Sequence, residues 1–171
     1  MSNDPHLRPI LFVDVDGVLS LYGFERGEQP PGAFHMVDGI LHCIGASCGR
    51  LMARLAGEFE LVWATGWEEK ANEYLVRLLE LEGELPTLTF DGRARFGTAH
   101  WKVDAIDEYA GDRPAAWIDD SLDEDCRAWA ERRDAPTLLV QTDPATGIEE
   151  EHVERLLAFA REVSERAPRP S

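Results

Sequence analysis

Basic residues are scarce in this chain of 171 residues: 17 Lys and Arg stand against 33 Asp and Glu, and the formal net charge is −16. Proteins that bind a long nucleic acid usually neutralise its phosphates with a broad basic surface. The charge balance argues against such a surface, so extended nucleic-acid binding is not expected. Recognition of a single phosphate in a local pocket is not excluded by this argument.

Cysteine and long apolar runs are also scarce. The three cysteines, Cys43, Cys48 and Cys126, have no metal-type spacing, and we interpret them as small core residues of a protein in a reducing compartment. The apolar runs are only a few residues long, which excludes a transmembrane helix, and residues 1–6 lack the features of a signal peptide. We therefore expect a cytoplasmic protein with no membrane partner.

The length and the ordinary composition, 44% hydrophobic and 29% charged, favour one globular domain over residues 1–171, with its core at about 8–166. Strand-like and helix-like patterns alternate along the chain, which predicts a three-layer α/β/α, Rossmann-like sheet that is mainly parallel, with strand order 3-2-1-4-5. The expected strands begin at Ile10 and then cover residues 59–65, 85–90, 115–119 and 137–141. The expected helices cover residues 46–57, 67–82 with Gly83 as the stop, 98–109, a segment capped by Ser121 and Glu124, and 148–166.

Residues 18–42 interrupt this alternation. They are rich in Gly and Pro and carry apolar patches at both ends. We predict a hairpin or flap beside the site, with residues 25–32 as its turn.

The first strand carries the strongest functional signal. The apolar run from Ile10 to Val13 is followed by Asp14, Asp16 and Gly17. Side chains at positions i and i+2 of an extended chain point the same way, so the two carboxylates are expected to converge. Two like charges at the end of a buried strand are costly without a cation between them. We therefore interpret this segment as the active-site strand.

Other polar residues are expected at the same edge of the sheet, because ligands bind outside the carboxyl ends of parallel strands. Thr65 ends the second strand, Asp119 and Asp120 end the fourth, and Lys102 lies near the start of the preceding helix. Carboxylates from separate strands suit Mg²⁺, and a lysine and a hydroxyl suit a phosphoryl group. One aspartate can then attack phosphorus while another carboxylate protonates the leaving oxygen and later activates water.

These motifs resemble those of the haloacid dehalogenase-like (HAD) superfamily. The sequence from Asp14 to Val18, Asp-Val-Asp-Gly-Val, resembles motif I, Thr65 resembles motif II, Lys102 resembles motif III, and residues 119–123, Asp-Asp-Ser-Leu-Asp, resemble motif IV. The resemblance covers about residues 10–141, with the motifs in the family's order.

The resemblance implies a role for each matched residue. Asp14 is expected to be the nucleophile and a metal ligand, and Asp16 the general acid/base that also gives its backbone carbonyl to the metal. Thr65, Gly66 and Lys102 are expected to bind phosphate, and Asp119 and Asp120 to hold Mg²⁺. Asp123 is a supporting candidate. An acid at position 16 favours phosphate-ester chemistry over dehalogenation.

Many members of the superfamily carry a cap domain after motif I or between motifs II and III. Neither gap in this chain has room for one, so a capless phosphatase is expected, and such members often act on large substrates. Small capless members also occur in RNA-repair proteins, but the net charge argues against that link. The expected partner is a phosphorylated substrate that can be macromolecular, and the oligomeric state is open.

Three alternatives to a Mg²⁺-dependent phosphohydrolase remain open from the sequence. The same site can transfer the phosphoryl group to an acceptor other than water. A receiver-like phosphorylation sensor also uses acidic residues, a Thr and a Lys, although the phosphoacceptor would then lie elsewhere. A catalytically idle HAD-like scaffold can serve as a binding module. Trp67 and Trp101 either pack or stack on a base or sugar beside the site, and packing is the favoured interpretation.

Overall fold

The computed structural model describes residues 8–168 and is built around a four-stranded parallel sheet. Its strands are β1 (Ile10–Val13), β5 (Glu60–Trp63), β6 (Ala115–Asp119) and β7 (Thr137–Gln141). The spatial order is β5-β1-β6-β7, and all three neighbouring pairs are parallel. The predicted mainly parallel α/β sheet is confirmed. Its two central strands, β1 and β6, lead to the predicted aspartates: Asp14 directly follows β1, and Asp119 is the last residue of β6.

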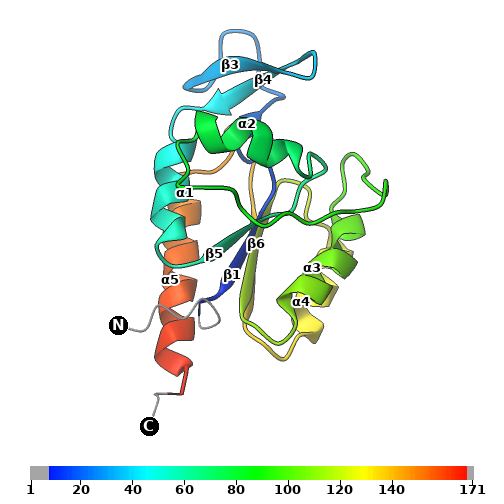
Figure 1. The fold of residues 1–171 in the computed structure, drawn as a ribbon, viewed down its shortest axis with the longest axis vertical. Coiled ribbons are helices and arrows are strands. Elements are labelled where there is room, and N and C mark those ends of the chain that lie inside the picture. Colours follow the sequence, from blue (N-terminus) through cyan, green and yellow to red (C-terminus); the bar gives the residue numbers. More distant parts are fainter. Residues whose placement is uncertain (1–7, 169–171) are drawn as a thin grey trace.

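Helices cover both faces of the sheet (Figure 1). Helices α1 (Cys48–Ala56) and α5 (Glu150–Arg166) pack on one face, and α3 (Val103–Ala110) and α4 (Glu124–Arg132) pack on the other. The apolar run of β1 serves both faces because its side chains alternate. Leu11 and Val13 belong to the core under α1 and α5, whereas Ile10 and Phe12 belong to the core under α3 and α4. All four are fully buried.

The predicted strand at residues 85–90 is wrong. This segment lies beside β5, where the strand was expected, but it forms only one parallel bridge, between Trp63 and Thr87. Pro86 has no N–H to donate, and the side chain of Asn72 takes both backbone groups of Leu85. The Leu85 N–H donates to Asn72 Oδ1 at 2.9 Å, and Asn72 Nδ2 donates to the Leu85 carbonyl at 2.8 Å. The single bridge to β5 uses the Pro86 carbonyl, which accepts the Trp63 N–H at 2.9 Å, and the Leu88 N–H, which donates to the Trp63 carbonyl at 3.0 Å. The next ladder bond would need an N–H from Pro86, so the ladder stops there.

A flap follows β1, as predicted, and forms a three-stranded antiparallel sheet. Its strands are β2 (Ser20–Leu21), β3 (Gly32–Val37) and β4 (Ile40–Gly45), in the order β2-β4-β3. The predicted turn is wrong, because residues 25–32 merely connect β2 to β3. The hairpin turn is Asp38-Gly39, where both φ angles are positive (49° and 80°), as a two-residue hairpin turn requires.

Helix α2 (Lys70–Leu78) lies between the flap and the sheet (Figure 1). It is shorter than the predicted helix at 67–82, because Glu80 takes a positive φ of 53° and ends it before Gly83. The predicted helix at 98–109 starts instead with a 3₁₀ turn, η1 (His100–Lys102), followed by α3.

The connections between the strands hold no inserted cap domain within residues 8–168. The flap and α1 fill the connection from β1 to β5, and α2 with loops fills the one from β5 to η1. None of the helices in this described part of the chain is long and apolar enough to span a membrane.

Candidate active site

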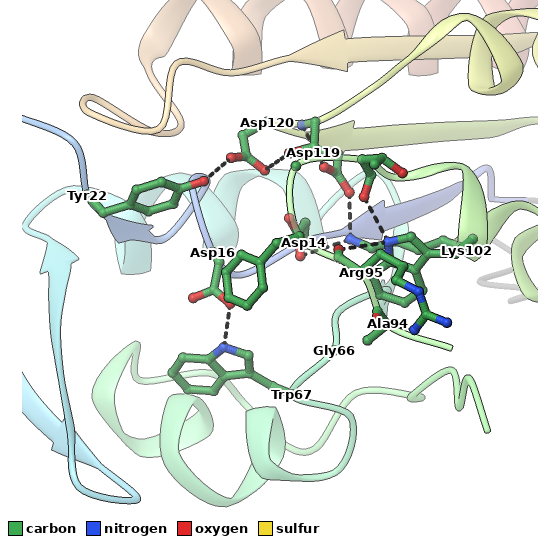
Figure 2. Close-up of a pocket in the computed structure, with 15 residues that line it drawn as sticks. Asp14, Asp16, Tyr22, Gly66, Trp67, Ala94, Arg95, Lys102, Asp119 and Asp120 are labelled. Atoms are coloured by element: carbon green, nitrogen blue, oxygen red, sulfur yellow. Dashed lines mark hydrogen bonds and ion pairs between the residues drawn. The ribbon is translucent and has the colours of Figure 1, made fainter. Parts of the chain in front are cut away.

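A buried lysine lies between two buried aspartates at the carboxyl end of the central strands (Figure 2). Lys102 Nζ is 3.0 Å from Asp14 Oδ1 and 2.6 Å from Asp119 Oδ2. The exposed fractions of the three side chains are 3%, 9% and 0%, respectively. Removing three charges from water carries a large desolvation cost, so a buried cluster of this kind is weak evidence for stability. A functional role accounts better for its presence.

The secondary structure fixes each member of this cluster. Asp14 directly follows β1, and its N–H continues the ladder by donating to the carbonyl of Ile118 on β6 at 3.1 Å. Asp119 is the last residue of β6, and its Oδ1 accepts the N–H of Ser121 at 2.9 Å. The other oxygen, Oδ2, is therefore left to face Lys102, which the η1 turn places against it.

Burial dominates the electrostatics of this cluster. Burial raises the pKa of Asp14 well above its ordinary value of 3.8, and the neighbouring ammonium of Lys102 offsets part of that effect. Burial by itself lowers the pKa of Lys102, but the charges of Asp14 and Asp119 outweigh it, and the net pKa is raised. The ammonium therefore stays protonated and favours the ionised carboxylate that a nucleophile needs.

Asp16 lies in the same pocket but has different neighbours. Its Oδ2 accepts a hydrogen bond of 3.0 Å from Trp67 Nε1, and its Oδ1 is 3.9 Å from His42 Nδ1 on the flap. The side chain is 45% exposed. Partial burial raises the pKa of Asp16, whereas Trp67 and His42 lower it, with a net rise. A carboxyl group that holds its proton more readily and reaches the open pocket suits a general acid.

Gly17 allows the loops after β1 and β6 to touch. It has a φ of 79°, and a Cβ atom at this position would collide with the carboxyl group of Asp120. Asp120 is held from two further sides: the Tyr22 hydroxyl donates to Oδ2 at 2.7 Å and the Ser121 hydroxyl donates to Oδ1 at 3.1 Å. Figure 2 shows Tyr22 reaching Asp120 from the flap.

Three of the predicted metal ligands converge. Asp14, Asp119 and Asp120 each offer a carboxylate oxygen, and these atoms lie within 4.8 Å of one another. An all-oxygen set of this kind fits Mg²⁺. Burial raises the pKa of both Asp14 and Asp120, and a bound divalent cation would stabilise their ionised forms. The carboxylate of Asp16 is not in this set, and the role of its backbone carbonyl as a metal ligand stays a prediction.

The cluster forms the floor of a cavity of about 280 Å³. Gly66 and Lys102, both predicted to bind phosphate, line this cavity, but Thr65 does not. Thr65 is 1% exposed, and its hydroxyl oxygen accepts the N–H of Trp67 at 3.2 Å. This hydrogen bond from Trp67 to Thr65 stabilises the turn that contains Gly66 and Trp67.

Sequence reasoning missed the loop at residues 94–98, which contributes Arg95 and Phe96 to the cavity wall. The loop has no periodic pattern that would have placed it there. Trp101 holds it in position, because its Nε1 donates to the carbonyls of Arg95 (3.1 Å) and Thr98 (2.8 Å) and its ring packs edge-on against Phe90. For Trp101 the packing interpretation fits these contacts, whereas Trp67 contacts a predicted catalytic residue directly.

Asp123 lies outside the cavity and caps helix α4, so the predicted capping box of Ser121 and Glu124 is wrong. Its Oδ1 accepts the N–H of Cys126 at 3.1 Å, and Oδ2 lies 2.9 Å from His100 Nδ1. Partial burial alone would raise the pKa of Asp123, but these hydrogen bonds, that of His100 first, lower it to about 2.

Loss of the Asp123 cap has a predictable cost. At pH 7, Asp123→Ala is expected to lower the free energy of unfolding by about 1 kcal/mol, whereas Asp123→Asn keeps most of the cap. Because the folded-state pKa is depressed, the charge of Asp123 stabilises the protein above pH ~4, and this contribution is lost as the pH falls toward ~2. Urea denaturation of the three proteins between pH 7 and 2 tests this. An Asp123→Ala deficit that is unchanged at pH 2 would contradict it.

The fold and the site together define the class of protein. A parallel α/β sheet carries carboxylates at the ends of its two central strands, with a buried lysine from the preceding helix and no inserted cap. This is the arrangement of a HAD-like domain. Comparison with protein families then narrows the assignment: residues 10–153 match the family described as the HAD domain in Swiss Army Knife RNA repair proteins, and the chain belongs to that family.

This result corrects one expectation. The net charge was taken to argue against a link with RNA-repair proteins, and for family membership that argument was wrong. Membership depends on the residues of the core and the site, about which the overall surface charge carries no information.

The chain was also compared with curated proteins and with solved structures. No curated protein matches the chain at a significant level. Among solved structures, a hypothetical protein from Xanthomonas campestris is similar over 94% of this chain and 87% of that chain, with 13% sequence identity and a TM-score of 0.48.

Proposed function

We propose that this protein is a Mg²⁺-dependent phosphomonoesterase that works through an aspartyl-phosphate intermediate on Asp14. One observation carries the proposal: the Asp14 carboxylate lies 3.0 Å from the buried ammonium of Lys102, in a cluster with Asp119 and Asp120, at the floor of an open cavity. Family membership independently supports phosphatase or phosphotransferase chemistry.

In the first half-reaction, a carboxylate oxygen of Asp14 attacks the phosphorus atom. The bond from Asp14 to phosphorus forms while the bond from phosphorus to the leaving oxygen breaks. Asp16 donates its proton to the leaving oxygen, and Lys102 keeps Asp14 oriented and neutralises charge on the phosphoryl group. Mg²⁺ held by Asp14, Asp119 and Asp120 would supply further neutralisation of the phosphoryl oxygens.

In the second half-reaction, water hydrolyses the acyl phosphate. Asp16, now ionised, takes a proton from the water as its oxygen attacks phosphorus, and the bond to Asp14 breaks. Inorganic phosphate leaves, Asp14 is regenerated as a carboxylate, and Asp16 is again protonated. The 45% exposure of the Asp16 side chain gives this water access to it.

We infer that the substrate is the terminal phosphate of an RNA strand, on the strength of the family's description. A strand end requires one local phosphate pocket and no broad basic surface, so the net charge of −16 is compatible with it. The cavity is open, and no cap closes over it, which suits a substrate larger than the cavity itself.

The test measures inorganic phosphate released from 3′- and 5′-phosphorylated oligoribonucleotides and from an aryl phosphate. Turnover is expected with Mg²⁺, is expected to disappear with EDTA, and is expected to return when Mg²⁺ is added in excess. Metal-independent turnover, or none on any of these substrates at high enzyme concentration, overturns the proposal. Phosphate and alcohol released in equal amounts exclude transfer to an acceptor other than water.

Asp16→Asn is expected to separate the two half-reactions. A good aryl leaving group needs little protonation, so the variant still transfers phosphate to Asp14, but it activates water roughly 10²- to 10⁴-fold less well. We expect a burst of aryl alcohol close to one equivalent per enzyme, followed by slow turnover, in rapid-mixing measurements. Loss of the burst together with the turnover would contradict this separation, because it would mean that even a good aryl leaving group needs the proton of Asp16.

A further inference from the structure

A second recess opens directly beside the catalytic cavity and has a volume of about 420 Å³. The two spaces share a wall, and Asp16, Tyr22, Gly66, Trp67 and Phe96 line both of them. The far wall of the second recess comes from the flap, through its hairpin turn and strand β4. A substrate whose phosphate lies against Asp14 can therefore extend past Asp16 toward the flap.

The walls of this recess are aromatic and apolar. Tyr22 is 48% exposed and Phe96 is 98% exposed, while Trp67 packs edge-on against His42 at a ring distance of 4.7 Å. Six large hydrophobic side chains are exposed among the described residues, and four of them line this recess: Tyr22, Ile40, Leu41 and Phe96. Exposed apolar side chains that gather at one place mark a binding surface.

Basic side chains lie on two sides of the space formed by the recess and the catalytic cavity: Arg95 lines the cavity and Lys70 lines the recess. Residues 92–98, which carry Phe96, contain Arg93 and Arg95 and no acidic residue. Lys70 lines the opposite side, where it is paired with Asp38. Arg95 and Tyr22 both line the catalytic cavity, and Figure 2 shows them on different sides of Asp14 and Asp16. Aromatic rings flanked by arginines are the combination that binds single-stranded nucleic acid, through base stacking and backbone contacts.

We propose, on the basis of the proposed function, that this recess binds the terminal nucleobase of the substrate, with the base stacked on Phe96. The position of Asp16 on the wall between the two spaces supports this, since the leaving oxygen that it protonates joins the phosphate to the nucleoside. The phosphoryl group lies on the Asp14 side of Asp16, and the nucleoside that departs lies on the flap side.

The test compares adenosine 5′-monophosphate with ribose 5-phosphate, which carry the same phosphate and differ in the base. Binding to the Asp14→Asn protein is measured by calorimetry, so that it needs no catalysis. The nucleotide is expected to bind roughly 5- to 150-fold more tightly, the factor that stacking of one base on an aromatic ring supplies. Phe96→Ala and Phe96→Leu are expected to remove most of this preference, and Phe96→Trp is expected to keep it.

The matched control is Phe34→Ala, because Phe34 is 46% exposed on the flap and lines neither space. It is expected to leave the preference unchanged. Equal affinity for the two ligands, or an equal loss for both in Phe96→Ala, overturns the nucleobase subsite and leaves the phosphatase proposal standing. A base preference that depends on Phe96, without phosphate release in the active protein, supports the subsite and overturns the phosphatase proposal alone.

Discussion

Lys102→Met is expected to lower the free energy of unfolding by about 3–5 kcal/mol at pH 7, because it leaves buried carboxylates without their cation. Methionine fills a similar volume, so the loss comes from electrostatics and not from a cavity. Asp14 and Asp119 are 9% and 0% exposed and would face each other with no ammonium between them. Phosphate release is expected to be lost as well, since the same ammonium orients Asp14.

The deficit in Lys102→Met is expected to grow with pH. Burial already raises the pKa of Asp14 above its ordinary value of 3.8, and loss of the ammonium raises it further. A carboxyl group with a raised folded-state pKa binds its proton more tightly in the folded protein, so it destabilises the fold as the pH rises above ~4. Urea denaturation at pH 4, 6 and 8 measures this trend.

Lys70→Met is the matched control. Lys70 pairs with Asp38 on the surface, where the two side chains are 59% and 44% exposed. Exposed pairs contribute only about 0–1 kcal/mol, so this variant should lose little stability and show no comparable trend with pH. A Lys102→Met protein as stable as Lys70→Met at pH 8 would refute the account of the buried cluster.

Asp14→Asn is expected to reduce phosphate release by roughly 10³- to 10⁶-fold, the range found when an enzyme loses its nucleophile. Asparagine keeps the shape of the side chain but does not form an acyl phosphate. Lys102 retains its 2.6 Å contact with Asp119, and one buried charge is removed. The free energy of unfolding should therefore change by less than about 1 kcal/mol, so that the loss of activity is not a loss of fold.

Two measurements complete the Asp14→Asn experiment. Acid-quenched wild-type protein incubated with ³²P-labelled substrate should carry label that hydroxylamine removes, as an acyl phosphate does, and Asp14→Asn should carry none. Asp112→Asn is the control, because Asp112 is exposed and precedes β6 at the opposite end of the sheet. Label that persists in Asp14→Asn would move the nucleophile to another residue.

The central sheet and the buried cluster could be predicted because both depend on local signals. Short apolar runs marked β1 and β6, and the carboxyl ends of neighbouring parallel strands lie at one edge. Asp14 and Asp119 therefore lie close together once the two strands are adjacent, and the η1 turn adds Lys102. The separation of Asp16 from that cluster could not be predicted, because it depends on the indole of Trp67, 51 positions away.

The errors arose where one side chain decides the backbone. Residues 85–90 have the composition of a strand, but Pro86 has no N–H for the next ladder bond to β5, and only one bridge forms. The role of Thr65 as a phosphate ligand stays a prediction: its hydroxyl oxygen accepts the N–H of Trp67, a contact that the sequence did not indicate, and its O–H can still donate. Sequence patterns do not report on contacts of this kind, because each involves a single donor and a single acceptor.

The contact between Gly17 and Asp120 has a consequence for how substrate preference can diverge within the family. Because a Cβ atom at position 17 would collide with the carboxyl group of Asp120, any other residue there would displace one of the proposed metal ligands. The chemistry is thereby confined to a narrow range of sequences. By contrast, residues 22–45 and 94–98 line the cavity and the recess beside it with side chains such as Tyr22, Leu41 and Phe96. We therefore expect insertions and substitutions there to change the substrate preference while the proposed chemistry at Asp14 is retained.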